Sequence, residues 1–274
     1  MHQSTLAVAR ALGIELDEPK GWTCCGATAG HQTNRLLAAS LPAANLAKVQ
    51  DMKLDMMVNC AACYSRMKVA NYEISVHPEI RQGVREALDR DYDGSVRVRH
   101  LLEVLLEDVG LETIANSLKY SLNGLKVACY YGCLLVRPPE ILKFDDPENP
   151  TSLDRLVKAM GGESLEWPCK VDCCGGGLSL SRTDVVVQLT ESILDMACRA
   201  GADCIAVSCP MCQVNLDLRQ ADINKQEGKS YHLPIAYITQ LLGLCLGVGA
   251  NELGFNKLMV PASIVLEKVV NRHE

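Results

Sequence analysis

The chain has 274 residues, a formal net charge of −6 and 48% apolar residues. This length and apolar content suffice for one large globular domain or two smaller ones. The acidic balance argues against a partner held by phosphate neutralisation, so we expect no nucleic-acid partner. Aromatic residues make up only 4%. Aliphatic, Met and Cys side chains must therefore fill the core, which suits a helix-rich α/β protein.

Fourteen cysteines are the unusual feature of the composition. Such a content indicates either a secreted, disulfide-bonded protein or an intracellular protein that holds metal. The first five residues, 1–5, contain neither a basic nor an apolar run, so the sequence shows no secretory signal. We therefore expect a metal-binding protein of the cytoplasm.

In the first half of the chain, apolar spacing predicts a helix from about residue 33 to 50, interrupted by Pro42. A short strand over 56–59 then ends at Cys60. Residues 77–118 have the pattern of amphipathic helices, with Leu101, Val104, Leu105 and Val109 on one face.

The second half contains clearer strands. We expect a strand over 126–131, a turn-rich insertion over 144–152, and a helix over 182–200 that ends at Gly201. A buried strand over 204–208 delivers Cys209, and Pro210 then begins a helix. The apolar stretch 233–250 contains a proline and three glycines, so it is interpreted as a buried helix end and loop, and not as a membrane span.

The cysteines mark an internal repeat. Cys24-Cys25-Gly26 recurs 149 residues later as Cys173-Cys174-Gly175, and the pair Cys60/Cys63 recurs at the same offset as Cys209/Cys212. Two copies of one α/β domain, 1–120 and 121–274, explain this register. Since sites in open α/β sheets form at the carboxyl ends of strands, both cysteine sets are expected there.

The residue types indicate the chemistry of these sets. The second set comprises five cysteines: Cys133, Cys173, Cys174, Cys209 and Cys212. Iron–sulfur clusters need thiolates that converge from several segments, and the glycines at 175–177 allow the required bend. Zinc is the alternative, because a CxxC pair also marks zinc sites. However, a CC pair joined to one CxxC is not a standard zinc pattern. The remaining cysteines are expected to be small core or half-buried residues: Cys129, Cys169, Cys198, Cys204 and Cys245.

The spacing Cys133-x39-Cys173-Cys174-Gly175-x33-Cys209-x2-Cys212 is similar to that of the "CCG" cysteine-rich domain. The surrounding sequence resembles the B-type subunit of heterodisulfide reductase along essentially the whole chain. The stretches that carry this resemblance are 130–138, 144–150, 179–184 and 238–243. The CCG motif alone is shared with proteins of glycolate- and lactate-type enzymes.

The resemblance implies a specific function. In that family each CCG domain holds a noncubane [4Fe-4S] cluster through five cysteines, and the two clusters cleave a disulfide between them. In methanogenesis this disulfide joins coenzyme M and coenzyme B. Electrons arrive from a C-type partner with iron–sulfur clusters, which is fed by an A-type partner with flavin. Carried over, the second set holds one cluster and bears the catalysis, whereas Cys24, Cys25, Cys60 and Cys63 belong to the first.

The first copy departs from the family pattern. The counterpart of Cys133 would fall before Met1, together with the first strand of that copy. Either roughly 20 residues of the living protein are absent from this sequence, or the first site is altered and holds zinc, a different cluster or nothing. Two other functions stay open: electron transfer within a glycolate- or lactate-type oxidoreductase, and a zinc-binding scaffold without a redox role.

Overall fold

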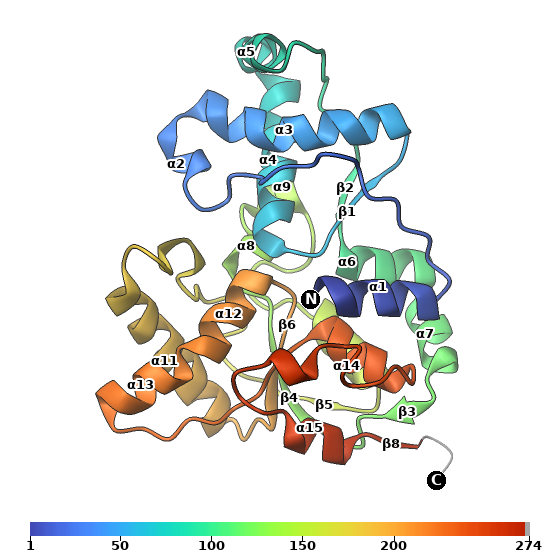
Figure 1. Cartoon of the computed structure of the whole chain (residues 1–274), viewed down its shortest axis with the longest axis vertical. Coiled ribbons are helices and arrows are strands. Elements are labelled where there is room, and N and C mark those ends of the chain that lie inside the picture. Colours follow the sequence, from blue (N-terminus) through green and yellow to red (C-terminus); the bar gives the residue numbers. More distant parts are fainter. Residues whose placement is uncertain (272–274) are drawn as a thin grey trace. The chain divides into compact units, whose positions relative to one another are not determined.

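The computed structural model describes residues 1–271 (Figure 1). Helices and short, mainly parallel strands confirm the predicted α/β class. The chain forms two compact units. The larger unit comprises Met1–Leu16, Leu102–Cys133 and Asp145–Glu274, and the smaller comprises Asp17–Leu101 and Leu134–Phe144. This grouping follows contacts and not the repeat, so the division at residues 120 and 121 stays a prediction. The last residues of the predicted second domain, 272–274, lie outside the described part of the chain.

The larger unit is built on a four-stranded parallel sheet with the order β5-β4-β6-β7. The strands are β4 (Lys126–Tyr130), β5 (Glu163–Ser164), β6 (Cys204–Val207) and β7 (Ile235–Tyr237). In register, Tyr130 of β4 lies opposite Val207 of β6, which lies opposite Tyr237 of β7. The residues of β6 and β7 are all buried, as in parallel sheets that helices cover on both faces. The strands predicted over 126–131 and 204–208 are therefore confirmed.

Helices surround this sheet. They are α1 (His2–Ala11), α7 (Leu111–Ser117), α10 (Ser152–Ala159), α11 (Thr183–Arg199), α12 (Pro210–Leu218), α13 (Gln220–Glu227), α14 (Ile238–Cys245) and α15 (Ser263–Lys268). Helices α11, α12 and α13 pack against one another, and α1 packs against α14 (Figure 1). Helix α11 confirms the prediction over 182–200, and α12 begins at the predicted proline, Pro210.

Short elements complete the larger unit. They are α6 (Leu101–Glu103), one π-helical turn (Val104–Val109), α8 (Cys133–Val136), two 3-10 turns (Gly176–Leu178 and Phe255–Lys257), and the antiparallel pair β3 (Tyr120–Ser121) and β8 (Val270–Asn271). Elements α6 and α8 each include residues of both units. Every residue of α14 is buried, which confirms the buried helix predicted within 233–250. The prediction missed strand β7 in the same stretch, and Gly247 and Gly249 after the helix are exposed. Within residues 1–271, no helix is both long and apolar enough to cross a membrane.

The smaller unit contains α2 (Gly30–Thr33), α3 (Arg35–Met52), α4 (Ala61–Val76), α5 (Pro78–Leu88), α9 (Pro139–Leu142) and the parallel strands β1 (Met56–Val58) and β2 (Val98–His100). The predicted interruption at Pro42 is wrong, because α3 runs through it. Proline costs the helix one hydrogen bond, and packing against α4 and α5 offsets that cost. The prediction of helices over 77–118 is also wrong in part. It missed the three-residue strand β2, which is too short to show a period.

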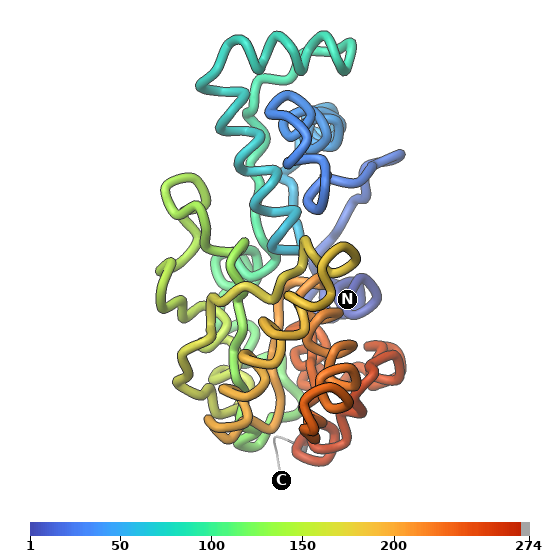
Figure 2. Tube along the Cα trace, turned by 90° about the vertical axis from the view of Figure 1, so that its left-hand side faces the viewer, coloured from blue at the N-terminus to red at the C-terminus, as the bar shows by residue number. Residues whose placement is uncertain are grey.

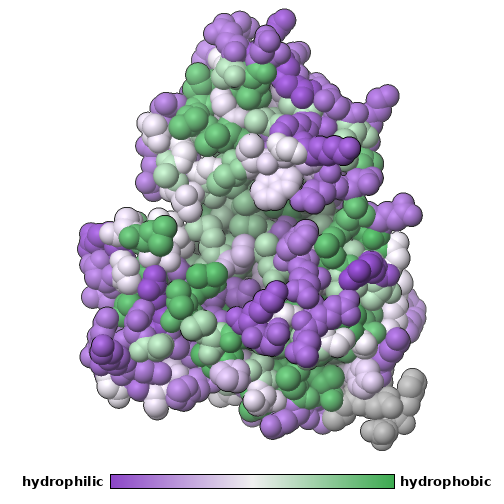
Figure 3. All heavy atoms as spheres, in the orientation of Figure 1, coloured by the Kyte–Doolittle hydropathy of each residue, from purple (hydrophilic) through white to green (hydrophobic). Residues whose placement is uncertain are grey.

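The strand pairing differs between the two units. Among the described residues, β1 pairs with β2 alone, whereas its counterpart β6 lies between β4 and β7. On the surface that Figure 3 shows, apolar side chains stand in separate patches among polar ones.

Candidate metal centres

The second cysteine set lies at the carboxyl end of the larger unit's sheet. Cys133 begins α8 shortly after β4, and Cys209 follows β6 and caps α12, which contains Cys212 in its first turn. The loop before the 3-10 turn Gly176–Leu178 brings Cys173 and Cys174 to the same place. In Figure 2 this gold loop and the orange start of α12 lie side by side. The structure thus brings together all five residues of the predicted set.

Close sulfur contacts join the five residues into two groups. The Sγ atom of Cys174 lies 3.5 Å from that of Cys212, which also hydrogen-bonds with Cys209. Cys133 and Cys173 form a second hydrogen-bonded pair. The backbone N–H of Gly175 donates to the Sγ of Cys173 at 3.3 Å, as expected where a loop turns its amides toward a thiolate.

The contacts change how readily these thiols ionise. The hydrogen bond from Cys133 lowers the pKa of Cys173 to about 6, and the same bond raises the pKa of Cys133. The pKa of Cys212 is raised by its hydrogen bonds with Cys174 and Cys209, and by burial. Crowded thiols of this kind resist losing all of their protons together unless a cation binds them.

Two glycines allow this close approach. A Cβ on Gly132 would lie 3.0 Å from the Sγ of Cys212, and one on Gly175 would lie 3.0 Å from the Cγ2 of Val186. Both residues also have positive φ, 68° and 71°. Because only glycine adopts this conformation at little cost, both positions need it. The bend at Gly175 leaves Cys173 exposed while Cys174 is buried.

The first set lies in the smaller unit and repeats two of these contacts. The Sγ atoms of Cys25 and Cys63 are 3.0 Å apart, and the N–H of Gly26 donates to the Sγ of Cys24 at 3.4 Å. Cys60 caps α4 as Cys209 caps α12. The pKa of Cys25 is raised by its hydrogen bond with Cys63 and by burial. The four residues of the predicted first set are thus also brought together.

Two other residues hold the CC loops, and neither was predicted from the sequence. The carbonyl of Asp172, just before Cys173, accepts a hydrogen bond of 2.6 Å from the Tyr130 hydroxyl. In the smaller unit, Thr23 occupies the position of Asp172. The amide of Asn45 donates to its carbonyl and accepts from its N–H, both at 2.8 Å. Tyr130 could have been found from its place at the end of the predicted strand, two residues before Gly132, but nothing in the sequence marks Asn45.

The donors fit a sulfur-bound metal centre in type and number. Thiolates favour soft metals and iron–sulfur clusters. In the second set the sulfurs meet as one pair, Cys133 with Cys173, and as one group in which Cys212 contacts Cys174 and Cys209. Within residues 1–271, no group of three or more His, Cys, Asp or Glu side chains is already arranged around a single metal ion. The fit therefore rests on the convergence of five thiols in one unit and four in the other.

The cysteines outside both sets are mostly core residues, as expected. Cys129, Cys169, Cys204 and Cys245 are buried. The expectation is wrong for Cys198, which is exposed. It lies on α11 beside the buried Ala197, and neighbouring helix positions face in different directions.

The fold and the repeated cysteine sets define a tandem cysteine-rich α/β protein. In agreement, the family profile described as "CCG: Cysteine-rich domain" matches residues 1–68 and 127–217. Relatives extend the match to nearly the full chain, and the chain belongs to the family of B-type heterodisulfide reductase subunits.

Three relatives show the range of this similarity. The B-type subunit of the ferredoxin:CoB-CoM heterodisulfide reductase of Methanosarcina mazei is 30% identical, over 98% of this chain and 91% of the relative. A protein of Archaeoglobus profundus, named as similar to the B-type heterodisulfide reductase subunit, is 32% identical, over 89% and 84%. The 8-methylmenaquinol:fumarate reductase membrane anchor subunit of Wolinella succinogenes is 32% identical, over 95% and 92%.

A solved structure shares the fold. The crystal structure of a hypothetical protein from Helicobacter pylori superposes with a TM-score of 0.74 and 15% sequence identity. The match covers 95% of this chain and 49% of that protein, so this chain spans about half of its length. At this identity the likeness supports the fold alone.

Proposed function

We propose that this chain is an iron–sulfur subunit of an oxidoreductase that reduces a disulfide to two thiols. One [4Fe-4S] cluster of the noncubane type would be held by Cys133, Cys173, Cys174, Cys209 and Cys212, and a first by Cys24, Cys25, Cys60 and Cys63. The observation that carries the proposal is the sulfur contact of each unit, Cys174 with Cys212 and Cys25 with Cys63, which repeats at one offset in the chain.

The chain's own residues would hold and orient this centre. Such a cluster, when bound, supplies electrons one at a time and an iron atom that a thiolate can bind. Cys209 stands at the first turn of the nine-residue helix α12, whose N–H groups favour the negative charge of a thiolate. In this hypothesis the cysteines act as ligands and none is a nucleophile. The disulfide takes up two electrons and two protons and leaves as two thiols.

The relatives suggest the setting of this reaction. Those from Methanosarcina are named for a CoB-CoM heterodisulfide and for ferredoxin. We accordingly propose two heterodisulfide reductase partners in the cytoplasm, the C type with iron–sulfur clusters and the A type with flavin. A complex of several proteins would also provide the two electrons that the disulfide needs.

A second candidate function is electron transfer in another oxidoreductase. The Wolinella relative, at 32% identity, is named as a subunit of an 8-methylmenaquinol:fumarate reductase. In that case the same cysteine sets would pass electrons to or from a partner and would cleave no disulfide. The substrate distinguishes the two functions.

Iron and acid-labile sulfide per chain, measured on protein prepared without oxygen, test the metal. Iron with matching sulfide supports the proposal, whereas zinc alone would identify a scaffold without a redox role. The loaded protein is then given a reduced viologen and a panel of disulfides, the CoM–CoB heterodisulfide among them. Cys209→Ala should abolish thiol release, and Cys245→Ala, at a buried cysteine outside both sets, should preserve it. Full activity of the Cys209→Ala protein would contradict the assignment.

A further inference from the structure

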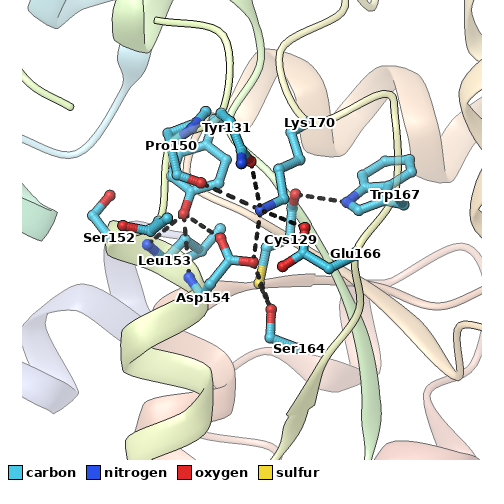
Figure 4. Close-up of polar contacts among 12 residues, drawn as sticks. Cys129, Tyr131, Pro150, Ser152, Leu153, Asp154, Ser164, Glu166, Trp167 and Lys170 are labelled. Atoms are coloured by element: carbon cyan, nitrogen blue, oxygen red, sulfur yellow. Dashed lines mark hydrogen bonds and ion pairs between the residues drawn. The ribbon is translucent and has the colours of Figure 1, made fainter. Parts of the chain in front are cut away.

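A buried ion pair lies in the larger unit close to the second cysteine set in the sequence. The Lys170 ammonium lies 3.0 Å from Oδ1 of Asp154, and the two side chains are only 4% and 5% exposed (Figure 4). Lysine is almost never buried to this extent unless it is paired. The cysteine pattern does not predict a charged pair at this place.

Both oxygens of the carboxylate are hydrogen-bonded. The hydroxyl of Ser164, on β5, donates to Oδ1 of Asp154 at 2.6 Å. The hydroxyl of Tyr131 donates to Oδ2 at 2.5 Å, and it accepts the N–H of Leu153 at the start of α10. Asp154 therefore connects α10, β5 and the end of β4.

The lysine is also fully engaged. Besides Asp154, its ammonium donates to the Oδ1 of Asn149 at 3.2 Å and to the carbonyl of Pro150 at 3.3 Å. Both acceptors belong to the turn-rich insertion predicted at 144–152. The exposed carboxylate of Glu166 also lies 3.9 Å from the ammonium, which is too long for a hydrogen bond (Figure 4). The three hydrogen-bond acceptors match the three donors of an ammonium group, so the pair fixes the insertion and the lysine together.

The backbone of Lys170 extends this connection to the cysteines. Its carbonyl accepts the N–H groups of Tyr131 and Gly132, at 2.8 Å and 3.1 Å. Gly132 immediately precedes Cys133, and Lys170 stands three residues before Cys173. One residue thus ties the strand end that bears Cys133 to the loop that bears Cys173.

Stability alone is a poor explanation for such a pair. The desolvation of two buried charges consumes most of their attraction, so apolar residues of similar size often fold equally well. What the pair supplies is a defined position for three chain segments. We propose that Lys170 and Asp154 are positioning residues that hold Cys133 within reach of Cys173; as part of an iron–sulfur site, this role rests on the proposed function.

The smaller unit offers an internal comparison. The residue 149 positions before Lys170 is Gly21, which has no side chain to form such a pair. There the CC loop is held through Thr23 and Asn45 instead. A variant at Lys170 should consequently disturb the second cysteine set and leave the first unchanged.

The test uses the full chain in its metal-free form, treated with the thiol oxidant diamide. Joining Cys133 to Cys173 removes two protons and two electrons, which diamide takes up, and peptide mapping measures the disulfide. We expect Lys170→Met to slow this cross-link by roughly tenfold, because a displacement of about an ångström between two reacting atoms is enough to slow their reaction this much. Cross-linking of Cys25 to Cys63 should not change. The matched control is Lys229→Met, since Lys229 forms a partly exposed pair with Glu191.

The cross-linking rate of the variants decides whether Lys170 positions the two cysteines. A folded Lys170→Met protein that cross-links at the wild-type rate overturns the proposal. If Lys170→Met does not fold, the double variant Lys170→Met/Asp154→Asn takes its place, because it buries no lone charge. A wild-type rate in the double variant also overturns the proposal, and a slow rate supports it.

Iron loading separates this inference from the proposed function. If the wild-type chain takes up no iron but its cross-linking depends on Lys170, the iron–sulfur function fails and the positioning role stands. If the chain takes up iron and the cross-link ignores Lys170, the positioning role fails alone. If both hold, Lys170→Met should also change the spectrum of the second site and preserve that of the first.

Discussion

The Sγ atom of Cys174 lies 3.5 Å from the Sγ of Cys212, although 38 residues separate them in the chain. The same separation and a contact of 3.0 Å join Cys25 to Cys63 in the smaller unit. In each unit one partner comes from the CC loop and the other from the first turn of the helix that follows a strand. The contact therefore belongs to the repeated fold and is the expected core of each metal centre.

Removal of one sulfur should show which site it serves. We expect Cys174→Ala to lower the iron bound per chain by roughly half if both sites fill, because a four-iron cluster loses a ligand. Cys25→Ala should remove the other half. Cys245→Ala is the control, since this cysteine is also buried and lies outside both sets. An unchanged iron content in the Cys174→Ala protein would exclude this residue as a ligand.

Gly132 should tolerate no side chain. Gly132→Ala places a methyl group 3.0 Å from the Sγ of Cys212, and φ is 68°. We expect a loss of ~2–4 kcal/mol in unfolding free energy from left-handed strain and overpacking, together with a disturbed second site. The matched control is Gly124→Ala, where φ is 66° but the Cβ meets nothing within 4 Å. It should show the strain alone, ~1–2 kcal/mol, and normal iron loading. Equal losses in denaturant titrations of the two variants would contradict this account.

Cys245 should be chemically inert in the folded protein. Burial raises the pKa of this thiol to about 12, so at pH 8 its thiolate fraction is only ~10⁻⁴. Mass spectrometry after brief alkylation at pH 8 should find Cys245 unmodified and the exposed Cys198 modified. Rapid modification of Cys245 without denaturant would show that it is not a core residue.

The same shift makes stability depend on pH. The pKa of Cys245 is higher in the folded chain than the ordinary thiol value near 8.5, so ionisation favours the unfolded state. The contribution of this thiol is complete below about pH 8 and declines as the pH rises toward 12. Between pH 8 and 10 the wild type should therefore lose more unfolding free energy than Cys245→Ala. Parallel curves for the two proteins would contradict this expectation.

The repeat made much of this structure predictable. Strand 204–207 and helix 183–199 follow from buried β-branched residues and from helical apolar spacing. Four cysteines of the second set follow from their register with the first, whereas Cys133 has no counterpart there and follows from its place after the strand predicted over 126–131. Strand β2 was missed because its three residues are too few to show a period. Helix α3 was predicted, but it continues through Pro42 because of its packing. The Lys170–Asp154 pair was invisible, because its partners lie on separate segments and single charged residues usually lie on the surface.

The two CC loops should depend on different side chains. Asn45 is buried and makes both hydrogen bonds to Thr23, whereas the Tyr130 hydroxyl makes one to Asp172. We expect Asn45→Ala to cost about 2–3 kcal/mol, because two backbone groups lose their partner, and Tyr130→Phe to cost about 1 kcal/mol.

Each variant should affect only the cysteine set of its own unit. Asn45→Ala should slow diamide cross-linking of Cys25 to Cys63 and leave that of Cys133 to Cys173 unchanged, and Tyr130→Phe should do the reverse. Peptide mapping of both cross-links in each folded variant provides the measurement, and each unaffected pair is the control for the other. The division follows because each tether ends on the residue just before its own CC pair, Thr23 before Cys24 and Asp172 before Cys173. Equal slowing of both cross-links by either variant would mean that the tethers act through overall stability and do not position one loop each.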